Sequence, residues 1–315
     1  MRVHQNIILN GKDIGDKHSR KGSKFCNEGK WDNYILPLLP ENPKDMTFTE
    51  FGSNAGLYLK MAKEYGFRDV TGIELEKRNC DVAKQYRDSL GLDYKIVNAR
   101  INDNFNYDLI PVSDVILLAN YHYHTLLPEF IHTLDILEHR ACYCLVVSVD
   151  SLGSVHWKPS PDINKTKHYF RNWEEVQTIY PISAEGDSHP RKMYSILFKS
   201  KLERLPIDEL KQRNERYFKK ERLLQEFIDV ILKNHNINAT NTRYFNYLVK
   251  EKKGKISNEI MAEFVNIKKK LVLDIKEHGI VKPVIIDDNK QLLDGSHRIS
   301  ILKYLKYDSV ITRTI

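Results

Sequence analysis

Short apolar runs alternate with amphipathic segments along the first two hundred residues. Runs of strand length recur between Met46 and Val149, and segments with the helical spacing of apolar residues separate them. The expected strands are Thr47–Phe51, Val70–Glu74, Tyr94–Asn98, Asp114–Ala119 and Cys142–Val149, with Met193–Phe198 as the closing strand. The expected helices are Leu57–Tyr65, Cys80–Leu90 and Leu127–His139. This alternation is typical of a parallel sheet with helices on both faces, so we predict a doubly wound α/β domain over residues 1–200.

The pattern changes after Ser200. Residues 206–270 are polar and charged with helical spacing, and Asn-rich breaks interrupt them. From Leu271 onward, strand-like and helical segments alternate again, and the turn at residues 287–289 indicates a hairpin. We therefore predict a second, smaller domain of the α+β class over residues 201–315.

The charge distribution separates the same two parts of the chain. Residues 1–200 contain 25 Lys+Arg and 26 Asp+Glu, whereas residues 201–315 contain 24 and 16. The positive excess therefore lies in the last third of the chain. It favours an anionic partner there, and a solvated lysine-rich surface is the alternative.

Composition also bears on the compartment. The chain has no apolar run of the roughly 18 or more residues that a membrane span needs, and its N-terminal apolar patch is too short for the core of a signal peptide. The cysteines are sparse and form no CxxC pair, and Cys142 and Cys144 lie in an apolar run. We expect a cytoplasmic protein without structural disulfides or zinc.

A glycine-rich junction, EFGSNAG, joins the first expected strand of this α/β domain to its helix. Gly52 allows a sharp turn, and Gly56 allows a ligand and the helix to approach closely. Glu74 ends the next strand, where a carboxylate can accept hydrogen bonds from both hydroxyls of a ribose. This combination resembles the class I S-adenosylmethionine-dependent methyltransferases with their Rossmann-like sheet, and the resemblance covers roughly residues 20–200.

The resemblance implies a role for each matching position. Glu50, Gly52, Asn54 and Gly56 would line the methionine moiety, and Glu74 would hold the ribose. The adenine would lie near Ala99, within Asn98–Arg100, although the acid that is usual there is absent from this chain.

The segment after the fourth strand, LLANYHYHTL, would face the methyl group. Asn120 would contact the cofactor, and His122 or His124 would serve as a general base or hold an anionic acceptor. Packing of one histidine against the cofactor is the alternative. The segment is not the Asn-Pro-Pro-Tyr box of the adenine-N6 methyltransferases, which makes a nucleobase amine a less favoured acceptor.

Basic residues are expected at the same edge. Arg191 and Lys192 precede the closing strand, and Lys21 and Lys24 lie near the N-terminus, where they are otherwise ordinary surface lysines. The layout from YHYH to HPRKMY resembles the methyltransferase half of bacterial O-antigen chain-terminating kinase–methyltransferases. That resemblance implies an acceptor that carries a phosphate, which the basic residues suit.

A second junction, DGSHR, lies between a strand and a helix near the C-terminus. The amides of Gly295, Ser296 and His297 open the helix, where its dipole and its donors both favour a phosphate, and Arg298 adds a forked donor. This segment resembles the ParB/sulfiredoxin superfamily, and its Asp-Gly-x-His-Arg form is most similar to the free-serine kinase branch. The resemblance implies ATP or ADP with Mg²⁺ as the ligand.

The same resemblance implies the catalytic residues of the second domain. Glu215, with Glu209 as the second choice, would be the base for the acceptor hydroxyl. Asp294 would hold magnesium or orient the acceptor, and His297 would contact a phosphate. A structural Asp-Gly turn is the alternative reading of this junction. The helical stretch at about residues 218–265 is an insertion relative to the compact family pattern.

Together the two junctions predict a bifunctional enzyme. It would phosphorylate a hydroxyl of a small molecule or glycan and transfer a methyl group, which could go to the new phosphate. One alternative is a methyltransferase whose ParB-like part only binds nucleic acid, in agreement with the positive charge. The other is a scaffold without catalysis. Intact residues at both junctions disfavour it, namely Gly52, Gly56, Glu74, Gly295 and Arg298.

Overall fold

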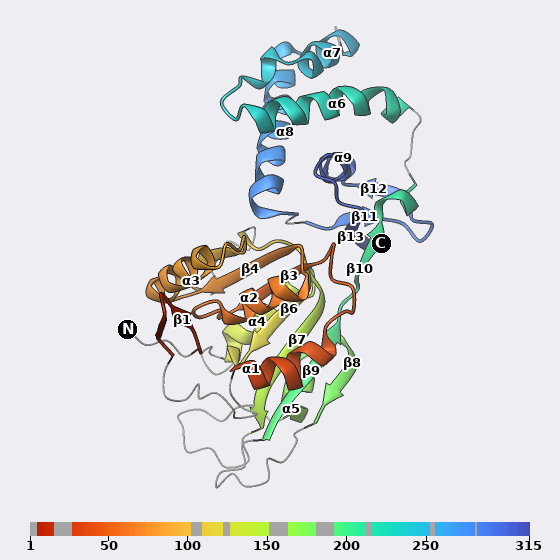
Figure 1. Cartoon of the computed structure of the whole chain (residues 1–315). Helices are drawn as coiled ribbons and strands as arrows, with labels where there is room; N and C mark the ends of the chain where they lie inside the picture. The colour runs from red at the N-terminus through yellow and green to blue at the C-terminus, as the bar shows by residue number, and fades with distance from the viewer. Residues whose placement is uncertain are drawn as a thin grey trace. The chain divides into compact units, whose positions relative to one another are not determined.

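The computed structural model describes residues 5–15, 27–101, 109–121, 127–150, 163–180, 192–211, 216–252, 256–280 and 282–315. The chain divides into two compact units (Figure 1). The first unit comprises Met1–Tyr107 and Ser113–Leu202, and the second comprises Asp108–Val112 and Glu203–Ile315. Among the described helices, none combines the length and the apolar character that a bilayer span requires.

A seven-stranded sheet forms the centre of the first unit. Its order is β5-β4-β3-β6-β7-β9-β8. The strands are β3 (Thr47–Phe51), β4 (Asp69–Glu74), β5 (Lys95–Asn98), β6 (Ser113–Ala119), β7 (Ala141–Asp150), β8 (Glu174–Ile179) and β9 (Lys192–Lys199). The first five in this order pair in parallel, whereas β9 runs antiparallel to both β7 and β8. The predicted α/β fold with a large sheet is confirmed, but the sheet is mixed rather than parallel.

The antiparallel strand β8 was absent from the expected elements for a physical reason. It lies at the edge of the sheet, and most of its residues are exposed. Its sequence, Glu-Glu-Val-Gln-Thr-Ile, therefore lacks the apolar run of a buried strand. Edge strands of this kind are specified by pairing with a neighbour, which the local pattern does not contain.

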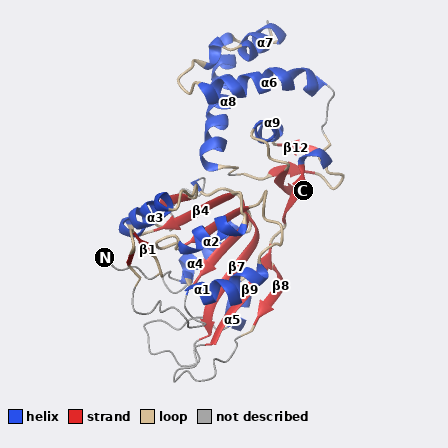
Figure 2. Cartoon of the chain, viewed as in Figure 1, coloured by secondary structure: helices blue, strands red, loops and turns tan. Residues whose placement is uncertain are grey.

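Helices and a small hairpin surround this sheet (Figure 2). The helices are α1 (Asn27–Lys30), α2 (Leu57–Tyr65), α3 (Lys77–Ser89), α4 (Leu127–Leu137) and α5 (Ile163–Tyr169), and the hairpin strands are β1 (Ile8–Leu9) and β2 (Lys12–Asp13). Helix α2 begins after Gly56 and ends before Gly66, both with left-handed backbone. Its buried residues Tyr58, Leu59 and Ala62 share a core with strand residues of the sheet.

The second unit has a four-stranded sheet in the order β10-β13-β11-β12. Its strands are β10 (Leu202–Pro206), β11 (Val284–Ile286), β12 (Leu292–Asp294) and β13 (Ser309–Thr314), and its helices are α6 (Arg216–Lys233), α7 (Arg243–Glu251), α8 (Asn258–His278) and α9 (Ser296–Tyr304). Strand β11 pairs with β12 as the expected antiparallel hairpin and with β13 in parallel.

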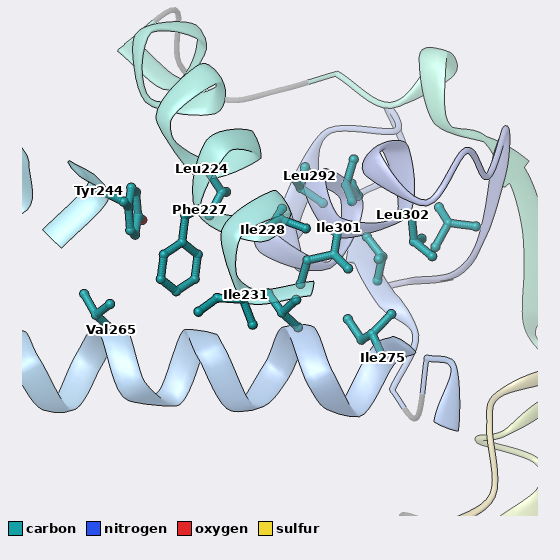
Figure 3. Close-up of a cluster of buried hydrophobic side chains, with 14 of the residues drawn as sticks. Leu224, Phe227, Ile228, Ile231, Tyr244, Val265, Ile275, Leu292, Ile301 and Leu302 are labelled. Atoms are coloured by element: carbon teal, nitrogen blue, oxygen red, sulfur yellow. The ribbon is translucent and has the colours of Figure 1, made fainter. Parts of the chain in front are cut away.

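The long helices and the small sheet of this unit share one core (Figure 3). Phe227, Ile228 and Ile231 of α6 point toward α8 and α9. The consecutive residues 299–302 of helix α9 are all buried. The helix is therefore covered on most sides, because α6 and α8 both pack against it.

Candidate functional site

The sheet of the first unit has a switch point between β3 and β6. These strands are neighbours, but the chain continues from β3 to β4 on one side and from β6 to β7 on the other. Loops diverge at such a point and leave a crevice at the carboxyl ends of the strands, where doubly wound folds bind ligands. Residues 52–56 follow β3 at this edge, and Asn120 follows β6.

The turn between β3 and α2 has an unusual backbone. The φ angles of Gly52, Asn54 and Gly56 are +73°, +48° and +86°. Glycine adopts this left-handed conformation without steric cost, and asparagine tolerates it. The amides of Gly52 and Ser53 both donate to the carbonyl of Ile73, at 2.8 Å and 3.1 Å. The turn is thus held against the end of β4.

The carboxylate of Glu74 joins the two loops at this edge. Its Oε2 accepts from the amide of Asn54 at 2.8 Å. Its Oε1 accepts from the amide of Glu76 at 2.8 Å and from Asn79 Nδ2 at 3.4 Å. A carboxylate offers about four acceptor positions, so Glu74 retains capacity for a ligand hydroxyl. The bond to Asn54 fixes the orientation of the carboxylate across the turn.

Three buried oxygens at the same edge have no partner among the described residues. They are Oε2 of Glu50, Oγ of Ser53 and Oδ1 of Asn120. Burial raises the pKa of Glu50 well above its usual range, and the negative charge of Glu74 raises it further. Buried polar atoms are almost always paired, so such unpaired atoms point to a missing partner such as a ligand. A cationic or hydrogen-bonding ligand would supply that partner.

Replacement of Glu50 by glutamine should change how stability depends on pH. The folded pKa is raised, so the stabilising contribution is complete below the unfolded pKa and is lost as pH rises toward the folded pKa. The neutral amide of the Glu50→Gln variant does not titrate. In urea unfolding between about pH 5 and pH 8, the free energy of unfolding of the variant should therefore increase relative to that of the wild type as pH rises. Parallel curves for the two proteins would mean that Glu50 ionises normally.

The polar groups near the expected adenine position are engaged with the protein. The amide of Ala99 donates to the carbonyl of Glu74 at 3.0 Å. Asn98 Nδ2 donates to the carbonyls of Glu74 and Leu75, at 2.9 Å and 2.8 Å. These bonds tie β5 to the loop after β4. The amide of Ala99 is thus already paired within the protein.

Two residues at this edge were missed by sequence reasoning. Leu75, next to Glu74, leaves 55% of its surface exposed and offers an apolar face to a flat ring. The sequence contains one indication of this residue, because Leu75 is an apolar residue between the acids Glu74 and Glu76. Gln5 is buried, and its Oε1 accepts from the amide of Leu57, the first residue of α2, at 3.0 Å. No local pattern around Gln5 indicates this contact.

Several predicted site residues lie outside the described residues. They are His122, His124, Arg191 and Glu215, together with Lys21 and Lys24. Lys192 opens β9 opposite Asp150 of β7, and its side chain is not described. The roles assigned to these residues remain predictions.

In the DGSHR turn of the second unit, both terminal nitrogens of Arg298 contact the protein. Gly295, with a φ angle of +105°, opens α9. Arg298 Nη2 pairs with Asp294 Oδ2 at 2.5 Å. Arg298 Nη1 donates to the carbonyls of Lys282 and Pro283, at 2.9 Å and 2.8 Å. Nη1 thus holds the turn against the preceding segment, whereas Nη2 pairs within the turn. The phosphate contact predicted for Arg298 stays a prediction.

His297 and Lys268 meet beside this turn. Lys268 Nζ lies 3.2 Å from His297 Nδ1. Burial lowers the pKa of His297 to about 4, and the charge of Lys268 contributes to the decrease. His297 is therefore neutral at physiological pH. Glu209, the second choice for a base, is paired with Lys290.

Within the described ranges, no group of three or more His, Cys, Asp or Glu side chains is arranged to hold a metal ion. Magnesium at Asp294 would therefore depend on water and phosphate oxygens for its other ligands, as Mg²⁺ commonly does.

No protein-family model and no curated protein matches the chain. Solved structures do match, all with low sequence identity. The PH0226 protein from Pyrococcus horikoshii OT3 is 9% identical, with 58% of this chain and 94% of that chain covered at a TM-score of 0.46. A SAM-dependent methyltransferase from Archaeoglobus fulgidus is 13% identical, with 57% and 96% covered and a TM-score of 0.45. A SAM-dependent methyltransferase from Aquifex aeolicus is 15% identical, with 55% and 93% covered and a TM-score of 0.41.

Proposed function

We propose that the first unit binds S-adenosylmethionine and transfers its methyl group. The observation that carries this proposal is the carboxylate of Glu74, oriented by the Asn54 amide at a switch point. An acid at this position suits the two hydroxyls of a ribose. Glu50 adds a buried carboxyl without a partner for its Oε2 among the described residues, which suits the cationic methionine end of the cofactor.

The remaining residues of the edge have distinct parts in this proposal. The left-handed turn at Gly52 and Asn54 brings the backbone close to the methionine moiety, and Gly56 opens α2 beside it. The exposed side chain of Leu75 packs against the adenine. When bound, the cofactor supplies a methyl group on a sulfonium, which is open to direct attack by an acceptor oxygen or nitrogen.

The acceptor in this proposal is a hydroxyl or phosphate of a small molecule or glycan. His122 or His124 acts as the base or holds the anion, and Arg191 and Lys192 bind an acceptor phosphate. The support is their position in the sequence: the two histidines come soon after β6, and Arg191 directly precedes Lys192, the first residue of β9. Transfer to a nucleic-acid base is the less favoured alternative.

Calorimetry with S-adenosylmethionine tests the cofactor. Wild-type protein should bind it and should release a proton on binding, because the cationic ligand stabilises the ionised form of Glu50, whose pKa is raised. The number of protons released is obtained from binding heats measured in buffers of different ionisation enthalpy, because the buffer takes up each released proton. The Glu50→Gln variant should bind without proton release. Binding of a nicotinamide dinucleotide in preference to S-adenosylmethionine would contradict the proposal.

For the second unit we propose nucleotide binding and phosphoryl transfer at the DGSHR turn. The specific observation is that the left-handed Gly295 opens α9 without a side-chain cap, and that the ammonium of Lys268 lies beside His297 in the first turn of this helix. ATP or ADP would place a phosphate at these amides, with Mg²⁺ at Asp294 and Glu215 as the base. Nucleic-acid binding by the same basic unit is the alternative.

The Asp294→Asn variant separates binding from transfer. The amide oxygen can still accept from the Gly295 amide, as Asp294 Oδ1 does at 2.7 Å. The charge that pairs with Arg298 and would bind Mg²⁺ is lost, and an exposed ion pair of this kind is worth about 0.2–1 kcal/mol. Affinity for ATP without magnesium should therefore change no more than about fivefold, whereas phosphoryl transfer to sugar, glycan or serine acceptors should be lost.

The nucleic-acid alternative makes the opposite prediction. The full-length protein would then shift a DNA probe with an affinity that falls steeply with salt, and it would consume no ATP with any acceptor. That result would remove the phosphotransfer proposal and leave the methyl-transfer proposal standing.

A further inference from the structure

The helices of the second unit enclose a cavity of about 340 Å³. Its walls come from α6, α7, α8 and the segment before α8, and His297 of α9 also lines it. This volume lies at the small end of the roughly 300–1,000 Å³ that is typical of ligand pockets. Neither of the proposed transfer reactions uses this cavity. His297 is the one lining residue that also has a predicted role in one of them, as a phosphate contact.

The lining is apolar and includes side chains that water reaches. Ile256, Ile260 and Phe264 line the cavity and leave 41%, 58% and 37% of their surfaces exposed. Leu248 and Met261 complete the wall from buried positions. Large apolar side chains that are exposed together around a hollow mark a binding site. A ligand in the cavity would remove these three side chains from water.

The polar groups of the lining carry no negative charge. Apart from the hydroxyl of Tyr244, they are the ammonium of Lys252 and the imidazole of His297. Lys252 forms no ion pair with a carboxylate within the described part of the chain. The ammonium of Lys268 only donates, so His297 Nδ1 accepts and the ring proton lies on Nε2. The cavity thus combines one positive charge with a neutral imidazole.

We propose that this cavity binds a small molecule with an apolar body and one anionic head group. The body packs against Ile256, Ile260 and Phe264, and the head pairs with Lys252. The concave shape and the small volume favour a small molecule over a protein segment. The single ammonium, with no carboxylate in the lining, selects an anion over a neutral or cationic head.

Calorimetric titration of the full-length protein with decanoate tests the apolar wall. Ile260 and Ile267 lie on the same helix and are both 58% exposed, but only Ile260 lines the cavity. Ile260→Glu should weaken decanoate binding by about tenfold or more, because it places a charge in the apolar wall. Ile267→Glu, the matched control, should leave the affinity within about twofold.

The head group is tested with ligands of equal chain length. Wild-type protein should bind decanoate more tightly than decanol or decyltrimethylammonium, by about tenfold. Lys252→Gln should remove that preference, whereas Lys250→Gln, an exposed lysine two residues earlier, should keep it. Anilinonaphthalene sulfonate, which has the same apolar and anionic character, should be displaced by decanoate.

Three results would overturn the proposal. The first is absence of saturable decanoate binding. The second is equal binding of decyltrimethylammonium, which would remove the role of Lys252. The third is a sedimentation result in which the wild-type chain self-associates and Ile260→Glu and Ile267→Glu both weaken that association equally. This face of α8 would then be a contact between copies of the chain.

Discussion

The Glu74→Ala variant is expected to lose S-adenosylmethionine affinity by roughly 5- to 150-fold. This range corresponds to about 1–3 kcal/mol, the usual cost of losing hydrogen bonds to a charged group. Glu74 is also buried and accepts from the amides of Asn54 and Glu76, so its removal also loosens the turn that lines the site. Calorimetry gives the affinity, and thermal unfolding gives the stability of each variant.

Two further variants separate the ribose contact from the structural role of Glu74. Glu74→Gln retains one acceptor oxygen. Its unfolding temperature should stay close to that of the wild type, whereas its affinity for S-adenosylmethionine should still fall. Glu76→Ala changes an exposed acid in the same loop and should leave binding within about twofold. Unchanged affinity in Glu74→Ala would remove this residue from the cofactor site.

The Gly72→Ala variant is expected to destabilise the first unit by about 1–3 kcal/mol, the usual cost of overpacking a core. A Cβ atom at Gly72 would lie 2.4 Å from Leu59 Cδ1 and 2.6 Å from Ser53 Oγ. Both neighbours are buried, Leu59 in α2 and Ser53 in the turn after β3. The clash therefore displaces the same turn that lines the candidate site, and cofactor affinity should fall together with stability.

Urea unfolding measures this loss. The Gly91→Asn variant is the control, because no atom lies within 4 Å of a Cβ at Gly91 and asparagine tolerates its left-handed backbone. Leu59→Ala vacates the space that the new methyl group needs. The double variant Gly72→Ala, Leu59→Ala should therefore cost less than the sum of the two single changes. An additive double variant would show that the clash is relieved elsewhere.

Element positions in the first unit were largely predictable because their signals are local. The expected helix Leu57–Tyr65 agrees with α2, since Gly56 and Gly66 mark its two ends. The expected strand Thr47–Phe51 agrees with β3 for a similar reason, because threonine and phenylalanine, which favour strands, precede the glycine turn. The exposed edge strand β8 was missed, because its pairing with β9 leaves no apolar pattern in its own sequence.

Candidate residues were predictable by position but not by partner. The spacing of Gly52 and Glu74 indicates that both lie at one sheet edge, and the bond from the Asn54 amide to Glu74 agrees with that. The partners of Arg298 were not predictable in full. Its ion pair with Asp294 joins residues only four apart in the sequence, but its bonds to the carbonyls of residues 282 and 283 depend on where the preceding segment lies.

The sequence by itself therefore determined the expected helices and strands that the structure contains, the glycine turns and the uneven charge, because each depends on neighbouring residues. Only the tertiary structure decided the order of strands in the large sheet, the unpaired oxygen of Glu50 and the apolar cavity at α8. These features depend on which segments meet in space. Contacts between residues far apart in the chain decide burial and pairing, and no local pattern encodes those contacts.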